Sequence, residues 1–491
     1  MSHHLPVLLV VVPLVAAPVI ALLNRPRISW AVAVAVTLWV LYAALALLSQ
    51  TMVDGEIHYA LGGWVAPYGI EYVVDPVNAW VIVIVALIGA LVTPYARMSV
   101  EREISEDRIP LFYAAFILCL TGLLGIAVTG DVFNVFVFLE ISSLSAYALI
   151  ALGKDRRALT ASFQYLIMGS VGATFIVIGI GLMYVMTGTL NMADLANRLP
   201  EVASTRTIPV AFTFLTVGIT LKLALFPLHL WLPNAYTYAP SAVTAFLAST
   251  ATKVAVYLLL RFFFTIFGVT FSFDVMQLDR ILMPLALVAI LTMSLVAIYQ
   301  ENVKRLLAYS SIAQIGYIVL GISLASVLGL TAGILHLFNH ALMKGALFMS
   351  MGCVMYRVGS VRLERMGGLG RAMPWTMAAF VVGGLSLIGA PLTVGFISKW
   401  YLVQAALEQG MWPVAGVVLL GSLLALMYVW KVIEVAYFRE VDPELGITEA
   451  PLSLLAPTWV LALSNVYFGI DASRTVGIAT RAAELLLGVL S

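Results

Sequence analysis

Long apolar stretches separated by short polar connections fill the chain from residue 5 to residue 470. A helix that crosses a bilayer needs about 20 mostly apolar residues, because it must satisfy its own backbone hydrogen bonds in lipid. The pattern therefore predicts about fourteen membrane-spanning helices. They lie at about residues 5–23, 30–50, 74–94, 110–128, 131–152, 161–187, 208–228, 241–266, 281–300, 303–324, 328–356, 375–409, 412–438 and 451–470.

The seventh and twelfth predicted spans contain helix-breaking residues. Prolines follow Lys222 in LKLALFPLHLWLP, and glycines and a proline precede Lys399 in LSLIGAPLTVGFISKW. Proline removes a backbone hydrogen bond and clashes with the preceding turn, so we expect both helices to be interrupted near mid-membrane. Ordinary kinks between packed helices are the alternative. Because the broken span is fourth in each of two successive sets of five, the pattern predicts two inverted five-helix repeats, as in transporters.

This layout predicts an all-α polytopic membrane protein without a separate soluble domain. The polar connections are too short to form a core of their own. The expected parts are an N-terminal three-helix segment at 1–109, a first repeat at 110–266, a second repeat at 281–438 and a C-terminal helix with a tail at 451–491.

Composition supports the membrane class. Hydrophobic residues make up 62% of the chain and charged residues 10%, with a net charge of +1, whereas soluble domains have about 25% charged residues. These values exclude a soluble globule, a disordered chain and a basic nucleic-acid-binding protein. The two cysteines, Cys119 and Cys353, lack partners at the spacing of iron–sulfur, zinc or redox sites, so we expect no metal or cofactor.

The arginines and lysines of the connections predict the orientation in the membrane. Most of them lie in the connections that lead from odd-numbered to even-numbered spans. Since Lys and Arg accumulate on the cytoplasmic side, both termini should face away from the cytoplasm. The first apolar stretch lacks a basic leader and a small-residue cleavage site, so we expect it to be a retained span. We expect a multi-pass protein of the inner (plasma) membrane.

Several ionisable residues fall inside predicted spans, where a charge costs about 2.5–3.5 kcal/mol. His336, His340 and Lys344 recur every four residues and therefore share one helix face. The complete set is Glu140, Lys222, Lys253, His336, His340, Lys344 and Lys399.

One intramembrane acid, Glu140, cannot neutralise all of these lysines. Structural pairing of Glu140 with one lysine is the simpler explanation, but it leaves the others unexplained. Buried lysines that are neutral or hydrated can load and release protons. The pattern therefore predicts a lateral proton relay that begins at a Glu140–Lys222 pair and ends at Lys399.

Metal and haem sites are disfavoured by the same residues. His336 and His340 have helical spacing for two metal ligands, but no HExxH acid or third ligand accompanies them. The histidines in the predicted spans are too few for a typical two-haem cytochrome. The chain also contains no Walker A sequence, no GxGxxG motif that opens a helix after a strand, and no nucleophile elbow.

Four runs resemble the antiporter-like membrane subunits shared by respiratory complex I, membrane-bound hydrogenases and Mrp-type cation/proton antiporters. They are KRLLAYSSIAQIGY, LFNHALMKGALF, LKLALFPLHLWLPNAY and TGTLNMADLA. The last run, which follows KDRRALTASFQYLIMGSVGAT, and the chain length most resemble the D-type subunit of Mrp antiporters. The resemblance implies that Glu140 is the essential glutamate of span five, Lys222 its partner, Lys253, His336, His340 and Lys344 the central relay, and Lys399 the terminal group.

The resemblance implies a proton-translocating transporter subunit, not an enzyme by itself, in a complex with other Mrp subunits. H⁺, Na⁺ or another monovalent cation, and lipids would be its ligands, and nucleic acid would not. A proton-pumping subunit of a redox complex is the alternative, because the energy source would lie in other chains. A scaffold with a degenerate relay is a third interpretation, but it predicts lost lysines, and none of the expected positions is lost.

Overall fold

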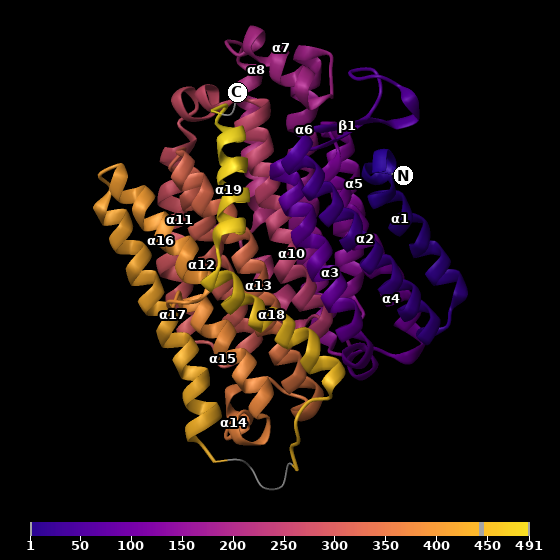
Figure 1. Ribbon diagram of the computed structural model, residues 1–491, viewed down its shortest axis with the longest axis vertical. Coiled ribbons are helices and arrows are strands. Elements are labelled where there is room, and N and C mark those ends of the chain that lie inside the picture. The colour runs from indigo at the N-terminus through magenta and orange to yellow at the C-terminus, as the bar shows by residue number, and fades with distance from the viewer. Residues whose placement is uncertain (1, 441–445, 490–491) are drawn as a thin grey trace.

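The apolar stretches form a bundle of helices in the computed structural model, which describes residues 2–440 and 446–489 (Figure 1). Eleven helices in this part of the chain are long and apolar enough to cross a membrane. They are α1 (Leu5–Leu23), α2 (Pro26–Asp54), α3 (Pro76–Glu103), α4 (Ile109–Val128), α5 (Val132–Ala151), α6 (Arg156–Thr187), α10 (Ser241–Leu260), α11 (Leu278–Ile298), α12 (Val303–Ser323), α17 (Trp412–Phe438) and α18 (Leu452–Ile470). The other three predicted spans correspond to α8 (Thr207–Leu223), α13 (Val327–Val358) and the pair α15 (Pro374–Ile388) and α16 (Val394–Glu408). The predicted all-helical membrane fold is confirmed.

Both expected interruptions are present. Helix α8 ends at Leu223, because Ala224 takes a left-handed φ of 59°, and the chain turns before α9 (Trp231–Tyr238). The second break follows α15, where Gly389 has a φ of 92° that favours glycine. The order of five helices with a broken fourth member therefore recurs, whereas the division into domains and the inverted relation of the repeats stay predictions.

Several short elements in the connections were not predicted. They are the antiparallel hairpin of β1 (Ile57–Ala60) and β2 (Glu71–Val74), and the helices α7 (Met192–Val202), α14 (Leu369–Ala372) and α19 (Ser473–Leu486). A search for long apolar runs misses them, because they are short and alternate between buried and exposed positions. In Figure 1, β1 and α7 lie at the upper end of the bundle and α14 at the lower end.

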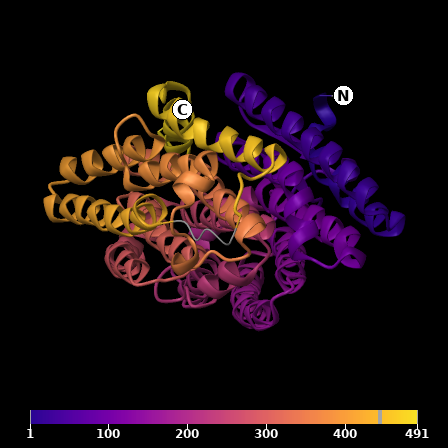
Figure 2. The ribbon, with the colours of Figure 1, turned by 90° about the horizontal axis from the view of Figure 1, so that it is seen from below.

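Helix α13 occupies the centre of the bundle. Every residue from Gly329 to Val354 is buried, because α3, α10, α12, α15, α16, α18 and α19 pack around it. Seen along the bundle in Figure 2, the indigo N-terminal helices and the orange helices near residue 400 lie on opposite sides of the molecule. The helix that carries three of the predicted site residues is therefore shielded on all sides.

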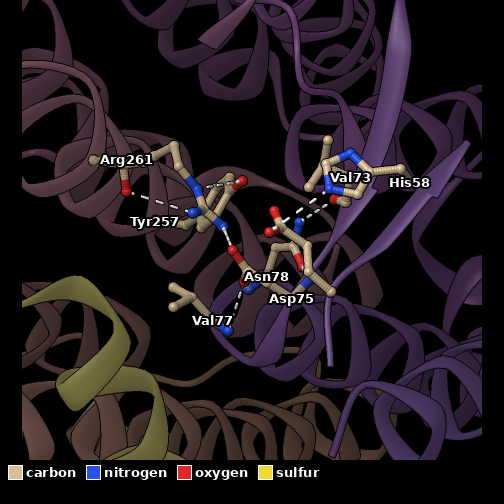
Figure 3. Close-up of polar contacts among 9 residues, drawn as sticks. His58, Val73, Asp75, Val77, Asn78, Tyr257 and Arg261 are labelled. Carbon is tan, nitrogen blue, oxygen red and sulfur yellow. Dashed lines mark hydrogen bonds and ion pairs between the residues drawn. The ribbon is translucent and has the colours of Figure 1, made fainter. Parts of the chain in front are cut away.

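A buried ion pair fastens α3 to α10 at the hairpin end (Figure 3). The guanidinium of Arg261 donates to the Asp75 carboxylate at 2.6 Å, and both side chains are almost fully buried. The other carboxylate oxygen of Asp75 accepts from the backbone of Val77 and Asn78 and caps α3. Arg261 also donates to the hydroxyl of Tyr257 at 3.2 Å and begins a π-helical segment, Arg261–Ile266.

Candidate functional site: buried lysines and histidines

The predicted site residues lie on five helices. Their positions are Glu140 on α5, Lys222 on α8, Lys253 on α10, His336, His340 and Lys344 on α13, and Lys399 on α16. All four lysines and both histidines are buried, and Lys253, His340 and Lys344 have no exposed surface. Glu140 differs from the rest, because it is only partly buried. The basic residues thus lie in the interior, as the cost of a charge in lipid requires.

The predicted pairing of Glu140 with Lys222 is not a direct contact in this structure and stays a prediction. Lys222 Nζ donates instead to Ser143 Oγ at 2.8 Å, and no ion pair of Glu140 occurs among the residues that the structure describes. Ser143 lies three residues after Glu140 on α5, so the two side chains share one face of that helix. A cavity of about 40 Å³ adjoins Lys222 and Ser143, which is room for a water or two.

Lys253 has backbone and hydroxyl contacts on its own helix. Its Nζ donates to the carbonyl of Ala248 and lies 3.4 Å from Thr252 Oγ1. Tyr257 and Thr250, which share its helix face, do not bind it: Tyr257 accepts from Arg261, and Thr250 donates to the Phe246 carbonyl. The Lys253 amine therefore points back along α10, away from the Asp75–Arg261 pair.

The three basic residues of α13 have different surroundings. His336 forms hydrogen bonds with Ser398 Oγ at 2.7 Å through Nδ1 and with Gln314 Oε1 at 2.9 Å through Nε2. Lys344 Nζ donates to the Leu307 carbonyl at 2.9 Å and to Ser310 Oγ. Both ring nitrogens of His340 lack a partner among the described residues.

Lys399 caps the end of α15 that the break exposes. Its Nζ donates to the carbonyls of Leu387 and Ile388 and to Ser422 Oγ, each at 3.0 Å. The amine also lies 4.7 Å from the centre of the Tyr317 ring. Carbonyls at a helix end carry partial negative charge, so the interruption supplies the acceptors for this lysine.

We call the four buried lysines and two buried histidines the basic row. One face of α12 carries polar side chains that contact three of its members, and these contacts were not predicted from the sequence. Ser310, Gln314 and Tyr317 follow one another at intervals of four and three residues and contact Lys344, His336 and Lys399, respectively. The polar residues within KRLLAYSSIAQIGY have the helical spacing that could have revealed this face.

No hydrogen bond joins two of the seven predicted residues directly in the described part of the chain. Each of their polar side-chain partners binds one of them instead: Ser143 binds Lys222, Ser310 binds Lys344, and Gln314 and Ser398 both bind His336. Proton transfer needs contact at hydrogen-bond distance or one intervening water. The arrangement can thus move protons only through these side chains and internal water.

Comparison with known proteins agrees with the fold. Residues 129–425 match the model of the NADH:quinone oxidoreductase/Mrp antiporter transmembrane family, and this range contains all seven site residues. The chain belongs to this family. The resemblance inferred from the sequence is confirmed.

Members of the family differ in the complexes they serve. NADH-quinone oxidoreductase subunit N of Desulforudis audaxviator is 42% identical over 487 residues, which are 96% of each chain. The D-type subunit of the Na(+)/H(+) antiporter of Bacillus subtilis is 31% identical over 443 residues, which are 90% of this chain and 88% of that protein.

Two solved structures of the family have the same architecture. A chain of the Mrp complex from Dietzia sp. DQ12-45-1b has a TM-score of 0.91 and 26% identity and covers all of this chain and 98% of its own. A chain of the membrane-bound sulfane sulfur reductase, an archaeal respiratory complex, has a TM-score of 0.90 and 31% identity, with coverage of 98% and 97%. This chain is therefore an antiporter-like, polytopic membrane subunit.

Proposed function

We propose that this chain is a proton-translocating subunit of a multisubunit monovalent cation/proton antiporter and that the buried basic row carries the protons. The observation that carries the proposal is the set of partners of the four lysines. Among the described residues, their amines donate hydrogen bonds only to hydroxyl and carbonyl oxygens. A lysine with such partners can lose its proton without leaving a buried carboxylate unpaired.

Proton movement would begin near Glu140 and Lys222. Ser143 holds the Lys222 amine, and Glu140 lies almost one turn before Ser143 on α5. A change in the charge of Glu140 then alters the cost of the Lys222 charge, because charges interact strongly where little water screens them. Glu140 is partly exposed on the bundle surface, where a neighbouring subunit of the complex would influence it.

His336 is suited to pass a proton onward. The Gln314 carbonyl oxygen accepts at Nε2 and the Ser398 hydroxyl meets Nδ1, so the ring can gain a proton on one nitrogen and release one from the other. At the end of the row, the carbonyls at the break of α15 stabilise a charged Lys399. The breaks also provide backbone groups and room for rearrangement.

Flux measurements on the assembled complex test the proposal. In everted vesicles, Lys222→Met and Lys344→Met should abolish cation-dependent proton flux. Lys431→Met is the matched control, because that lysine pairs with Glu301 at 3.1 Å near a helix end. Wild-type flux in both relay variants would refute the proposal.

A second candidate is a proton-pumping subunit of a redox complex, which the 42% identity to an NADH-quinone oxidoreductase subunit N favours. The basic row would then serve the same transfer, with redox chemistry in partner chains as its energy source. The tagged chain can be purified with its partners and assayed in proteoliposomes. Proton flux driven by a Na⁺ gradient alone supports the antiporter, whereas flux that requires an electron donor and a quinone supports the redox complex.

A further inference from the structure

Lys304 is a buried lysine outside the proposed row. It stands in the first turn of α12, and only 2% of its surface is exposed. Its Nζ donates to the Ala239 carbonyl at 2.7 Å, just before α10 begins. No ion pair of Lys304 occurs in the part of the chain that the structure describes. It therefore has the same type of partner as the lysines of the row.

A cavity of about 330 Å³ opens beside Lys304. It is lined by Arg102 and Glu103 at the last turn of α3, whereas the hairpin leads into the first turn of that helix, so the cavity lies at the opposite end of the bundle. We call it the Lys304 cavity. Its wall includes the ionisable residues Arg102, Glu103, Lys154, Asp155 and Lys304, together with Met355. This volume holds several waters, and ionised side chains of both signs favour hydration. Since these connections are rich in arginine and lysine, this end is the expected cytoplasmic side.

Glu103 is the carboxylate nearest in this wall to the start of α10. It accepts from the backbone nitrogen of Ser241 at 3.0 Å, from Ser241 Oγ at 3.1 Å and from Ser99 Oγ at 2.9 Å. These three donors hold the carboxylate beside the first turn of α10, two residues beyond the carbonyl that binds Lys304. Glu103 thus places a fixed negative charge in the cavity that contains Lys304.

Helix α12 carries Lys304 in its first turn and, further along, the acceptors of Lys344, a member of the row. The Leu307 carbonyl, one turn deeper than Lys304, accepts from Lys344, and Ser310 accepts from the same amine. Ser310 stands six positions after Lys304, a rise of about 9 Å along the helix. Ser311, two turns further along α12 than Lys304 and on the same face, also donates to the Leu307 carbonyl.

From this placement we infer that Lys304 is a further proton-carrying residue and that the Lys304 cavity is the aqueous access to the row on the expected cytoplasmic side. In each transfer, one N–H bond of the Lys304 ammonium breaks and its proton passes through water to the Lys344 amine. A proton from the aqueous phase then restores the ammonium. The inference rests on the proposed function, because it supplies protons to the same row.

Two variants separate proton transfer from a structural role. Lys304→Arg keeps the positive charge and the donor to Ala239, but arginine does not release its proton. Lys304→Met removes both. We expect assembled complexes of both variants to lose cation-dependent proton flux at least tenfold, whereas Lys431→Met, which also removes a lysine bound to carbonyls at this end, keeps it. Wild-type flux in Lys304→Arg would overturn the inference.

Accessibility provides an independent readout that does not depend on flux. The test starts from a chain in which Cys119→Ala and Cys353→Ala remove the native thiols. Met355→Cys and Lys304→Cys, both in the wall of the Lys304 cavity, should then each react with a charged, membrane-impermeant thiol reagent from the arginine-rich side only. A Lys304→Cys thiol that is unreactive from both sides would overturn the access route. If Lys222→Met and Lys344→Met both retain wild-type flux, the proposed function itself fails; if only the Lys304 variants retain it, the access route alone fails.

Discussion

Two sets of buried charges in this chain are arranged in opposite ways. At the hairpin end, Arg261 meets the Asp75 carboxylate at 2.6 Å, and the same carboxylate caps α3 (Figure 3). In the basic row, the lysines contact hydroxyl and carbonyl oxygens, and none forms an ion pair within the described ranges. The Asp75–Arg261 pair is neutral overall, whereas the lysines of the row have no carboxylate partner among the described residues.

The difference separates charges that stabilise the fold from charges that can change. Arginine stays protonated, and a buried ion pair that loses one partner leaves a costly uncompensated charge. A lysine bound to hydroxyls and carbonyls leaves only neutral groups behind when it loses its proton. We therefore interpret the Asp75–Arg261 pair as a clamp that holds α3 against α10, and the lysines of the row as the groups whose charge can change.

The largest expected effect is on flux in the row. Lys253→Met should lower proton flux by about 100-fold or more, the range expected for loss of an acid–base group, without loss of complex stability. The amine of Lys253 has no carboxylate to leave unpaired, and methionine fills similar space. Dye-quenching in vesicles and thermal unfolding of the purified complex measure the two quantities. Reduced assembly with unchanged flux per complex would reverse our interpretation.

The opposite result is expected for the clamp. Arg261→Met should destabilise the fold by about 3–5 kcal/mol, because Asp75 is left buried and unpaired. Flux per assembled complex should stay near the wild-type value. The double variant Arg261→Met, Asp75→Asn should recover part of the stability, since it removes the orphaned charge. Thermal unfolding in detergent tests this, and equal stability of the single and double variants would contradict it.

A smaller effect is expected where a neutral group binds a relay lysine. Ser143→Ala removes the acceptor of the Lys222 amine. A hydrogen bond to a charged group is worth about 1.5–3 kcal/mol, and the lower value corresponds to a change in flux of about tenfold. Ser143→Thr keeps the hydroxyl and is the matched control. Equal flux in the alanine and threonine variants would show that this contact does not position Lys222.

The smallest effect is expected for an exposed pair outside the spans. Arg157 donates to Asp155 and holds the pKa of that carboxyl below its usual range. A lowered carboxyl pKa adds stability at neutral pH, which is lost as the pH falls below about 3.9 and through the native pKa. Because the pair is exposed, Arg157→Ala should cost at most about 1 kcal/mol at pH 7. A comparison of unfolding at pH 7 and pH 3 measures it, and a larger cost at pH 3 would contradict the assignment.

Much of the fold could be predicted because its signals are local. The spans follow from the length of apolar runs, and both interruptions follow from Pro227 and from Gly389, whose left-handed backbone ends α15. The short elements were missed, since α7 buries only Met192, Leu195 and Leu199 and has no long apolar run. For the site, the identities of the buried lysines and histidines could be inferred, but their partners could not.

The sequence by itself determined that the chain crosses a membrane many times, where two helices break and which lysines and histidines fall in the middle of the apolar runs. These results depend on the apolar length of each segment and on the cost of placing a charge in lipid. Tertiary structure alone decided that Ser143 and not Glu140 meets Lys222, that Gln314 meets His336, that Asp75 neutralises Arg261 and that Lys304 is buried beside a cavity. Such contacts depend on which faces of distant helices pack together, and a shift of one residue in register would replace each partner.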